Sequence, residues 1–357
     1  MSEHLLKDHR DAIDAIDAQM LDLLNQRAGH ARAIGEIKGG GVVYRPEREA
    51  QVLRRIKDLN QGPLSGESVA RLFREVMSEC LALERPLSVA YLGPEGTFTQ
   101  LAAVKHFGHA ARTVACASVD EAFRLVESRA LDYVVAPVEN STEGAVGRTL
   151  DLMVSSALQI CGEVVLRIHH HLLRKPEDAV PLRRVYAHAQ ALAQCHEWLN
   201  KNIDEHVERI SVASNAEAAR LAGLEAGSAA IAGQAAAERY QLDKVAENIE
   251  DEPNNTTRFL VLGHQAVGPS GQDKTSLIVA APNRAGALYT LLAPIAEHGV
   301  SMTKLESRPA RAGLWEYVYF IDMEGHRSDA NVEAALQALA ARAAFVKVLG
   351  SYPVAVI

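Results

Sequence analysis

Two threonines and an arginine stand where a polar segment meets an apolar one, in the stretch NNTTRFLVLG (Asn254–Gly263). The apolar run predicts a buried β-strand, and a plain turn in front of it would need Asn or Gly rather than Thr-Thr-Arg. Thr257 and Arg258 are therefore candidates for contact with a ligand. The alternative, in which the threonine only caps the strand through a local turn, stays open.

Two glycine-containing turns are further candidates for contact with a ligand. The motifs GPEGTF (Gly93–Phe98) and PVENSTEG (Pro137–Gly144) each lie where a predicted strand leads into a predicted helix. Helix N-termini offer free N–H groups to an anion, although such a turn taken alone is more often plain geometry. The glycine spacing fits neither a Walker nor a dinucleotide motif, which argues against a nucleotide. Because α/β folds bind ligands at the edge of a cleft, we expect both motifs to meet the Thr-Thr-Arg segment there.

Charged side chains on the apolar side of the N-terminal helices indicate a third kind of site. Arg27 and Lys38 fall on the same side of the first helix as its apolar residues, and a buried cation is costly unless it is paired. Glu49 leads the apolar face of the second helix, and Glu84 extends that of the third. This arrangement predicts a pocket for a small polyanion, with structural salt bridges as the alternative. Arg10 lies about 100° away from Arg27 around the helix and would serve the pocket of a partner chain.

The periodicity of the apolar residues divides the chain into three regions. Residues 5–38 predict one long helix that pairs with its copy in a dimer, followed by a helix from Pro46 to about Ile56 and by a third helix. From Arg85-Pro86 onward strands alternate with helices, which predicts a two-lobed α/β domain around a cleft. After a Gly- and Pro-containing connector, the order βαββαβ predicts a ferredoxin-like unit. The expected domains are 1–85, 86–265 and 272–357.

Composition limits the classes of function. The chain has 357 residues, and its net charge of −8 argues against a general binder of nucleic acid or of an anionic membrane. The charged N-terminus, the short apolar runs and the four scattered cysteines predict a cytoplasmic protein with reduced thiols. Three consecutive histidines (His169–His171) would alternate between the two faces of a strand, so we expect no metal site there. Trp198 and Trp315 are interpreted as packing residues.

The N-terminal region, with its inward basic and acidic residues, resembles the all-helical chorismate mutases in the form that is fused to a prephenate dehydratase. Arg45 and Cys80 depart from the residues that some relatives carry, which are Asp and Ser. A rearrangement of this type needs no cofactor, because it requires only a substrate held in its reactive conformer and stabilised charge on the breaking C–O bond. The resemblance implies three kinds of substrate contact: to the carboxylates from Arg27, Arg48 and Arg10 of the partner subunit, to the ether oxygen from Lys38 and Glu84, and to the ring hydroxyl from Glu49.

Five motifs in the middle region, in chain order, resemble the prephenate dehydratases over residues 87–265: GPEGTF, PVENSTEG, AQALAQC, SNAEAA and NNTTRF. The resemblance implies a periplasmic-binding-protein-like fold in which Thr257 is catalytic and donates a hydrogen bond to the leaving oxygen. It also implies that Arg258 binds a substrate carboxylate or braces the site. One departure is Ala187, where a serine often stands in the family. The residues that would line the cleft are Glu139, Asn140, Ser141, Thr142 and Gln194.

The C-terminal region resembles the ACT domains that bind small effectors in enzymes of amino-acid metabolism, with GAL and ESRP as its phenylalanine-binding motifs. Together the three resemblances imply a bifunctional enzyme that converts chorismate to prephenate and then to phenylpyruvate, with L-phenylalanine as inhibitor and no cofactor. The alternative is a non-catalytic amino-acid-binding regulatory protein. The residues implied in phenylalanine binding are Gly286, Ala287, Leu288, Glu306, Ser307, Arg308 and Pro309.

Overall fold

The computed structural model describes residues 2–39, 41–281, 284–310 and 317–356, so Gly40 and Trp315 lie outside the described residues. Packing divides the chain into two compact units, which are described separately below. The first unit comprises Met1–Arg45, Leu53–Leu87 and Phe107–Arg112. The second comprises Pro46–Val52, Ser88–His106 and Thr113–Ile357.

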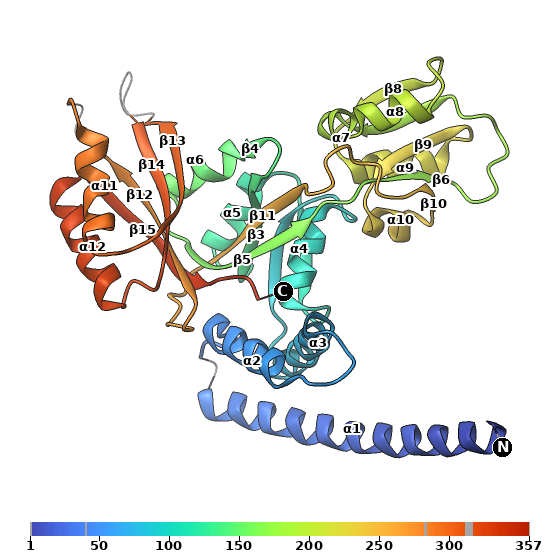
Figure 1. Cartoon of the computed structure of the whole chain (residues 1–357), viewed down its shortest axis with the longest axis horizontal. Helices are drawn as coiled ribbons and strands as arrows, with labels where there is room; N and C mark the ends of the chain where they lie inside the picture. The colour runs from blue at the N-terminus through green and yellow to red at the C-terminus, as the bar shows by residue number, and fades with distance from the viewer. Residues whose placement is uncertain (1, 40, 282–283, 311–316, 357) are drawn as a thin grey trace. The chain divides into compact units, whose positions relative to one another are not determined.

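Three helices dominate the N-terminal region, as predicted (Figure 1). The last two begin with recognisable signals, since Pro46 occupies the first turn of its helix and the Ser65 hydroxyl accepts a hydrogen bond from the Ser68 N–H at 3.1 Å. The first helix ends before Gly39, whose φ of 59° is left-handed. The helices are α1 (Ser2–Lys38), α2 (Pro46–Leu59) and α3 (Gly66–Glu84).

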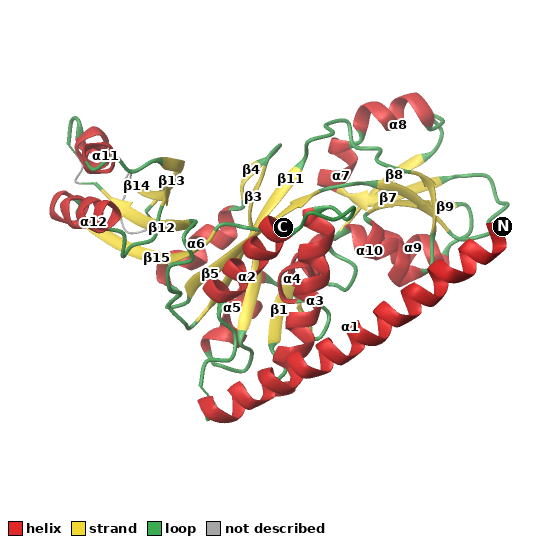
Figure 2. Cartoon of the chain, turned by 60° about the horizontal axis from the view of Figure 1, so that its bottom comes forward, coloured by secondary structure: helices red, strands yellow, loops and turns green. Residues whose placement is uncertain are grey.

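Helix α1 packs against α3 through its second half only. Half-buried residues of α1 are spaced at helical intervals from Arg27 to Gly35. A Cβ atom on Gly35 would lie 2.7 Å from Cγ of Glu84, so this crossing requires glycine. Toward the N-terminus the predicted apolar stripe is uncovered, with Ile13 56% and Ile16 54% exposed in the single chain. Figure 2 shows α1 as one long, continuous helix.

A mixed sheet forms the first lobe of the second unit. Its strand order is β2-β1-β3-β11-β5, with β4 paired to β3. The β1–β3 pair is parallel, whereas β11 runs antiparallel to both β3 and β5. The strands are β1 (Ser88–Leu92), β2 (Arg112–Cys116), β3 (Tyr133–Asn140), β4 (Gly144–Ala145), β5 (Gln159–Arg167) and β11 (Thr256–Gly263), and the helices are α4 (Phe98–Phe107), α5 (Val119–Glu127) and α6 (Gly147–Ser155).

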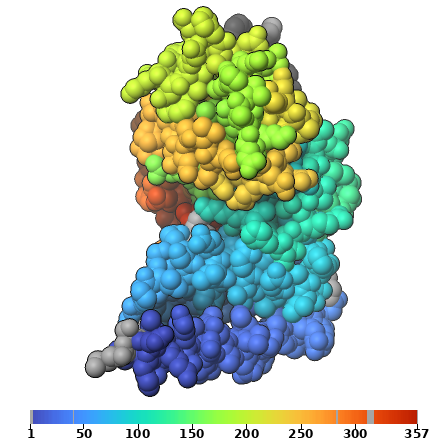
Figure 3. Space-filling model, turned by 90° about the vertical axis from the view of Figure 1, so that its right-hand side faces the viewer, coloured from blue at the N-terminus to red at the C-terminus, as the bar shows by residue number. Residues whose placement is uncertain are grey.

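A second sheet forms the other lobe, which Figure 3 shows in yellow-green to yellow. The chain leaves the first sheet after β5 and returns to it in β11, so that the last strand of the region enters the middle of the first sheet. The second sheet has the order β10-β6-β9-β7-β8. Its strands are β6 (His171–Arg174), β7 (Arg184–His188), β8 (Glu208–Val212), β9 (Ser228–Ala232) and β10 (Asp243–Ala246), and its helices are α7 (Ala189–Gln194), α8 (His196–Asn202), α9 (Asn215–Leu224) and α10 (Gln234–Tyr240).

The C-terminal region follows the predicted order βαββαβ. Its four strands form one antiparallel sheet in the order β13-β14-β12-β15. The elements are β12 (Asp273–Ala280), α11 (Ala287–Glu297), β13 (Met302–Pro309), β14 (Tyr317–Glu324), α12 (Ala330–Arg342) and β15 (Phe345–Pro353).

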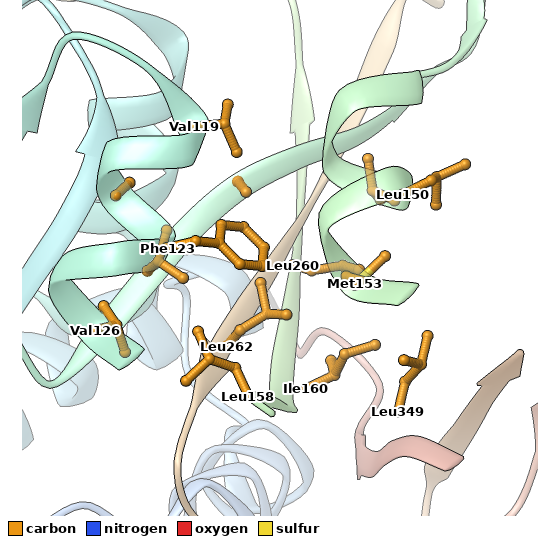
Figure 4. Close-up of a cluster of buried hydrophobic side chains, with 14 of the residues drawn as sticks. Val119, Phe123, Val126, Leu150, Met153, Leu158, Ile160, Leu260, Leu262 and Leu349 are labelled. Atoms are coloured by element: carbon orange, nitrogen blue, oxygen red, sulfur yellow. The ribbon is translucent and has the colours of Figure 1, made fainter. Parts of the chain in front are cut away.

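The C-terminal sheet and the first lobe share one apolar core. Leu349 of β15 belongs to the same buried cluster as Ile160 of β5 and Leu260 of β11, and all three side chains are drawn in Figure 4. Gly350 permits this close approach, because a Cβ atom there would fall on the carbonyl oxygen of Ile160. Strand β15 is therefore packed directly onto the sheet that carries Thr257.

Candidate active site

Thr257 and Arg258 open strand β11 and point to opposite faces of the first sheet, because successive side chains of a strand alternate. The register places Thr257 opposite Asn140 and Arg258 opposite Glu139 on β3. One face therefore carries Thr257 with Asn140, and the other carries Arg258 with Glu139.

The Thr257 hydroxyl is held by an amide of the neighbouring strand. Asn140 Nδ2 donates hydrogen bonds to Thr257 Oγ1 and to Asn255 Oδ1, each at 2.9 Å. Among the residues that the structure describes, Thr257 Oγ1 accepts this one hydrogen bond and donates none. The oxygen is thus fixed while its hydrogen stays available to another acceptor. The donor to this hydroxyl is a side chain of another strand, not the backbone of a local turn.

The turn that follows β3 is fixed by the same asparagine. Asn140 Oδ1 accepts from the Thr142 hydroxyl, from the Thr142 N–H at 3.0 Å and from the Glu143 N–H at 3.2 Å. Gln194 Nε2 donates to Thr142 Oγ1 at 3.1 Å. Ser141 exchanges hydrogen bonds of 2.9 Å with the backbone of Thr256. The structure therefore brings together the predicted residues Asn140, Ser141, Thr142, Gln194 and Thr257.

Two residues that were not predicted belong to the same cluster. Asn255 Nδ2 donates to Gln194 Oε1 at 3.1 Å, and His170 Nε2 lies 3.0 Å from the same oxygen. Burial lowers the pKa of His170, so the neutral ring donates its Nε2 hydrogen to Gln194. Asn255 stands in the NNTTRF motif and could have been noticed there. His170 carried no signal of its own beyond the histidine run.

The histidine run does not converge on one point. His169 Nδ1 lies 2.7 Å from Glu250, while His171 Nδ1 accepts from the Asn248 N–H at 3.2 Å. Among the described residues, no three His, Cys, Asp or Glu side chains are grouped so that they could hold a metal ion.

A cavity of 570 Å³, within the size range of small-molecule sites, lies in the second unit, and neither Thr257 nor Asn140 lines it. The GPEGTF turn lines it together with His188 and the start of α9 at Ser214 and Asn215. The ring of Phe98, which also lines the cavity, meets the His170 ring edge-on at 5.7 Å between centroids. Phe98 and His170 thus connect the GPEGTF turn to the Asn140–Thr257 cluster.

Glu139 and Arg258 contact the C-terminal sheet on the other face. Lys304 Nζ of β13 lies 2.7 Å from Glu139 Oε2, and Arg258 Nη1 lies 2.5 Å from Asp322 of β14. The substrate contacts predicted for Glu139 and Arg258 stay predictions.

In the first unit, two of the predicted groups come together. Lys38 Nζ lies 3.6 Å from Glu84 Oε2, and the Glu84 side chain is 8% exposed. Arg27 Nη1 lies 3.5 Å from the carbonyl oxygen of Val76 on α3. Arg10 stands on the exposed part of α1.

The other residues predicted to bind a substrate or phenylalanine lie on α2 and in the C-terminal region. Arg48 is exposed and Glu49 is half-buried in the first turn of α2. Gly286 precedes α11 in the left-handed conformation (φ 74°), so that Ala287 and Leu288 open the helix. The segment Glu306–Pro309 ends β13, where Arg308 Nη2 lies 3.1 Å from Asp151 of α6.

Three family models match the chain in succession: chorismate mutase type II over residues 9–85, prephenate dehydratase over 89–267 and the ACT domain over 275–341. The bifunctional chorismate mutase/prephenate dehydratase of Neisseria gonorrhoeae is 66% identical over 358 residues, covering 99% of each chain. The chain belongs to the bifunctional chorismate mutase/prephenate dehydratases.

Further relatives support this membership. The bifunctional chorismate mutase/prephenate dehydratase of Pseudomonas aeruginosa is 52% identical over 360 residues, covering 99% of this chain and 98% of its own. The prephenate dehydratase of Arthrobacter aurescens, solved in complex with L-Phe, has 32% identity and a TM-score of 0.69 over 75% of this chain and 90% of that one.

The family assigns chorismate mutase activity to the helical region and prephenate dehydratase activity to the region of the two sheets, followed by an ACT domain. This favours an enzyme over the alternative of a non-catalytic amino-acid-binding regulator. No described helix has both the length and the apolar character that crossing a bilayer demands.

Proposed function

We propose that this bifunctional enzyme turns chorismate into phenylpyruvate in two steps, under feedback by L-phenylalanine. The Asn140–Thr257 hydrogen bond, which leaves the threonine hydrogen available, is the observation that carries the dehydratase assignment. The proposed domains are 1–85, 86–265 and 272–357. We assign the middle domain to the periplasmic-binding-protein-like folds because its chain crosses twice between two sheets, and the last domain to the ferredoxin-like folds because of its sheet order.

In the mutase reaction, no bond to the protein forms, so the site acts through position and charge. Lys38, which lies near Glu84, donates to the ether oxygen as negative charge develops there. Glu84 can donate to that oxygen only in its protonated form. The further contacts are those of Arg27, Arg48 and Arg10 of the partner subunit with the carboxylates, and of Glu49 with the ring hydroxyl.

Glu84→Gln tests the donor role. Glutamine keeps the size and always carries N–H donors, so mutase turnover should vary less with pH than in the wild type, whose turnover declines as pH rises. Mutase rates with chorismate from pH 5 to 9 give the profile, and dehydratase activity of the same sample controls for folding. An identical profile in the variant removes Glu84 from this role.

The uncovered stripe of α1 supports the proposal of a homodimer. Ile13, Ile16 and Met20 are each more than half exposed, and a partner helix would remove this apolar surface from water. Arg10 lies on this exposed part of the helix, so its role in a mutase pocket also requires a second chain.

Ile16→Glu tests the pairing of α1. The buried charge should weaken the dimer by at least about tenfold and lower mutase activity with it. Ala18→Glu, about 160° around the helix from Ile16, is the matched control and should leave the dimer intact. Sedimentation over a range of protein concentrations measures the equilibrium, and equal behaviour of the two variants contradicts the pairing.

In the dehydratase reaction, prephenate loses carbon dioxide and hydroxide, and the ring becomes aromatic. The electron pair of the breaking C–C bond enters the ring as the C–O bond breaks, so charge grows on the leaving oxygen. A threonine hydroxyl is too weak an acid to give up its proton unaided, but it can donate a hydrogen bond to that oxygen. Because Asn140 already donates to Thr257 Oγ1, the threonine hydrogen remains for the substrate.

Thr257→Val and Thr257→Ser test this step as a pair. Valine removes the donor at nearly constant volume and should lower dehydratase turnover about a hundredfold or more, whereas serine keeps the donor and should retain most of it. Formation of phenylpyruvate from prephenate measures both, with mutase activity as the folding control. Near-full turnover in the valine variant contradicts the assignment.

Asn140→Asp extends the same test to the direction of the hydrogen bond. The carboxylate would accept the Thr257 hydrogen and withdraw it from the substrate, so turnover should fall; the change also removes the donor to Asn255 Oδ1. Undiminished turnover in this variant would show that Asn140 does not set the direction of the Thr257 hydroxyl.

Phenylalanine is the proposed effector of the C-terminal domain. A structural neighbour was solved in complex with L-Phe, and both predicted motifs are present here, at the start of α11 and the end of β13. The proposed contacts are those of Gly286, Ala287, Leu288, Glu306, Ser307, Arg308 and Pro309.

Calorimetry with L-phenylalanine tests the effector site, with D-phenylalanine as the ligand control. We expect binding that also lowers dehydratase turnover. Gly286→Ala should weaken it about tenfold, because the left-handed backbone there strains any side chain. Gly299→Ala is the control: Gly299 follows α11, also has a left-handed backbone, and has no neighbour that an added Cβ would meet. This variant should bind L-phenylalanine like the wild type. Absence of heat with L-phenylalanine defeats the proposal.

A further inference from the structure

We propose that the C-terminal sheet is a working part of the dehydratase site, in which Tyr352, Ser276 and Asp322 hold Arg258 in a closed ring of hydrogen bonds. The ring fixes the start of strand β11 and thereby positions Thr257, the residue that directly precedes Arg258 in the strand. This inference rests on the proposed role of Thr257.

The hydrogen bonds of the ring have one consistent direction. Ser276 Oγ donates its single hydrogen to Asp322 Oδ1. The Tyr352 hydroxyl lies 2.7 Å from Ser276 Oγ and must therefore donate its own hydrogen to the serine oxygen. Arg258 closes the ring, because Nη2 donates to the Tyr352 oxygen at 2.9 Å and Nη1 to Asp322 Oδ2 at 2.5 Å. Burial, together with the Asp322 charge, raises the pKa of Tyr352 well above its usual value, so the phenol keeps the proton that it donates.

The charges around the ring are balanced. Arg258 Nε also donates to Glu163 of β5 at 2.8 Å, and Lys274 of β12 lies 2.9 Å from the same carboxylate. The Arg258 side chain is 13% exposed and that of Glu163 is 3% exposed. With Lys304 on Glu139, three cations from two domains face three acids across one interface. Burial alone would lower the pKa of Arg258, but the carboxylates of Asp322 and Glu163 raise it, so the guanidinium stays charged.

This geometry commits Arg258 to the ring. Each of its three nitrogen atoms donates to a different partner, Glu163, Asp322 or Tyr352. Turning the guanidinium toward a substrate would leave the buried Asp322 without its Arg258 partner and Glu163 with Lys274 alone, which is unfavourable. Of the two roles that the sequence allowed, the structure therefore assigns bracing to Arg258. It is a positioning residue, and the ACT-type sheet supplies most of its partners.

Tyr352→Phe tests the ring, with Ser351→Ala as the matched control. Phenylalanine removes only the hydroxyl, so that Ser276 Oγ loses its donor while keeping its bond to Asp322, and Arg258 Nη2 loses its acceptor in the ring. Ser351 is the neighbouring buried residue of β15, and its hydroxyl bonds to Thr275 at 2.8 Å, away from Arg258. We expect kcat for prephenate to fall about tenfold in Tyr352→Phe, with KM within about twofold of the wild type. In Ser351→Ala both constants should stay within about twofold.

The measurement uses the full-length enzyme, with mutase activity and thermal unfolding followed in the same samples. Asp322→Asn is the second variant and should repeat the loss of kcat, because it removes the charge that holds Arg258. The proposal is overturned if Tyr352→Phe and Asp322→Asn both keep the wild-type kcat, or if Ser351→Ala loses as much kcat as they do. It is also overturned if the ring variants raise KM while kcat stays constant. An unchanged Tyr352→Phe beside an inactive Thr257→Val defeats only the ring, whereas an active Thr257→Val defeats the role of the threonine.

Discussion

Successive side chains of a β-strand point to opposite faces, and this constraint organises the dehydratase region. It sends the Thr257 hydroxyl toward Asn140 and the Arg258 guanidinium toward the C-terminal sheet. A register shift of one residue would exchange the two groups, placing a cation among the amides and a hydroxyl among the acids. The position of the catalytic candidate and the docking of the C-terminal domain are therefore set by the same strand.

Apolar burial and buried ion pairs contribute differently to the interface between the first lobe and the C-terminal sheet. Leu349 and Tyr352 are almost fully buried in the core shared with the first lobe, and burying such a side chain contributes about 1.5–3 kcal/mol. Buried ion pairs such as Arg258–Asp322 add little net stability, because desolvation offsets their attraction. They do penalise any displacement that would leave one partner alone. Apolar burial thus holds the two domains together, while the charges define their register.

The sequence was informative where the signal is local and less so where contacts span the chain. Apolar periodicity predicted the three N-terminal helices and the order βαββαβ, and the family motifs predicted the residues around Thr257. Local patterns do not reveal that β11 enters the sheet between β3 and β5, which creates the contact of Asn140 with Asn255, 115 residues away. The Arg258–Asp322 pair depends on the docking of two domains, and no periodicity encodes it.

The chemistry of decarboxylation gives a reason to keep Arg258 out of the cleft. The carboxylate that leaves as carbon dioxide loses its negative charge in the transition state, so a cation beside it would stabilise the substrate more than the transition state and slow the reaction. The groups bonded around Thr257 are amides, hydroxyls and a histidine whose pKa is lowered by burial. These neutral donors can assist the departing hydroxyl without holding the carboxylate in its charged form. Placing the strand's only guanidinium on the opposite face, among acids of another domain, meets that requirement.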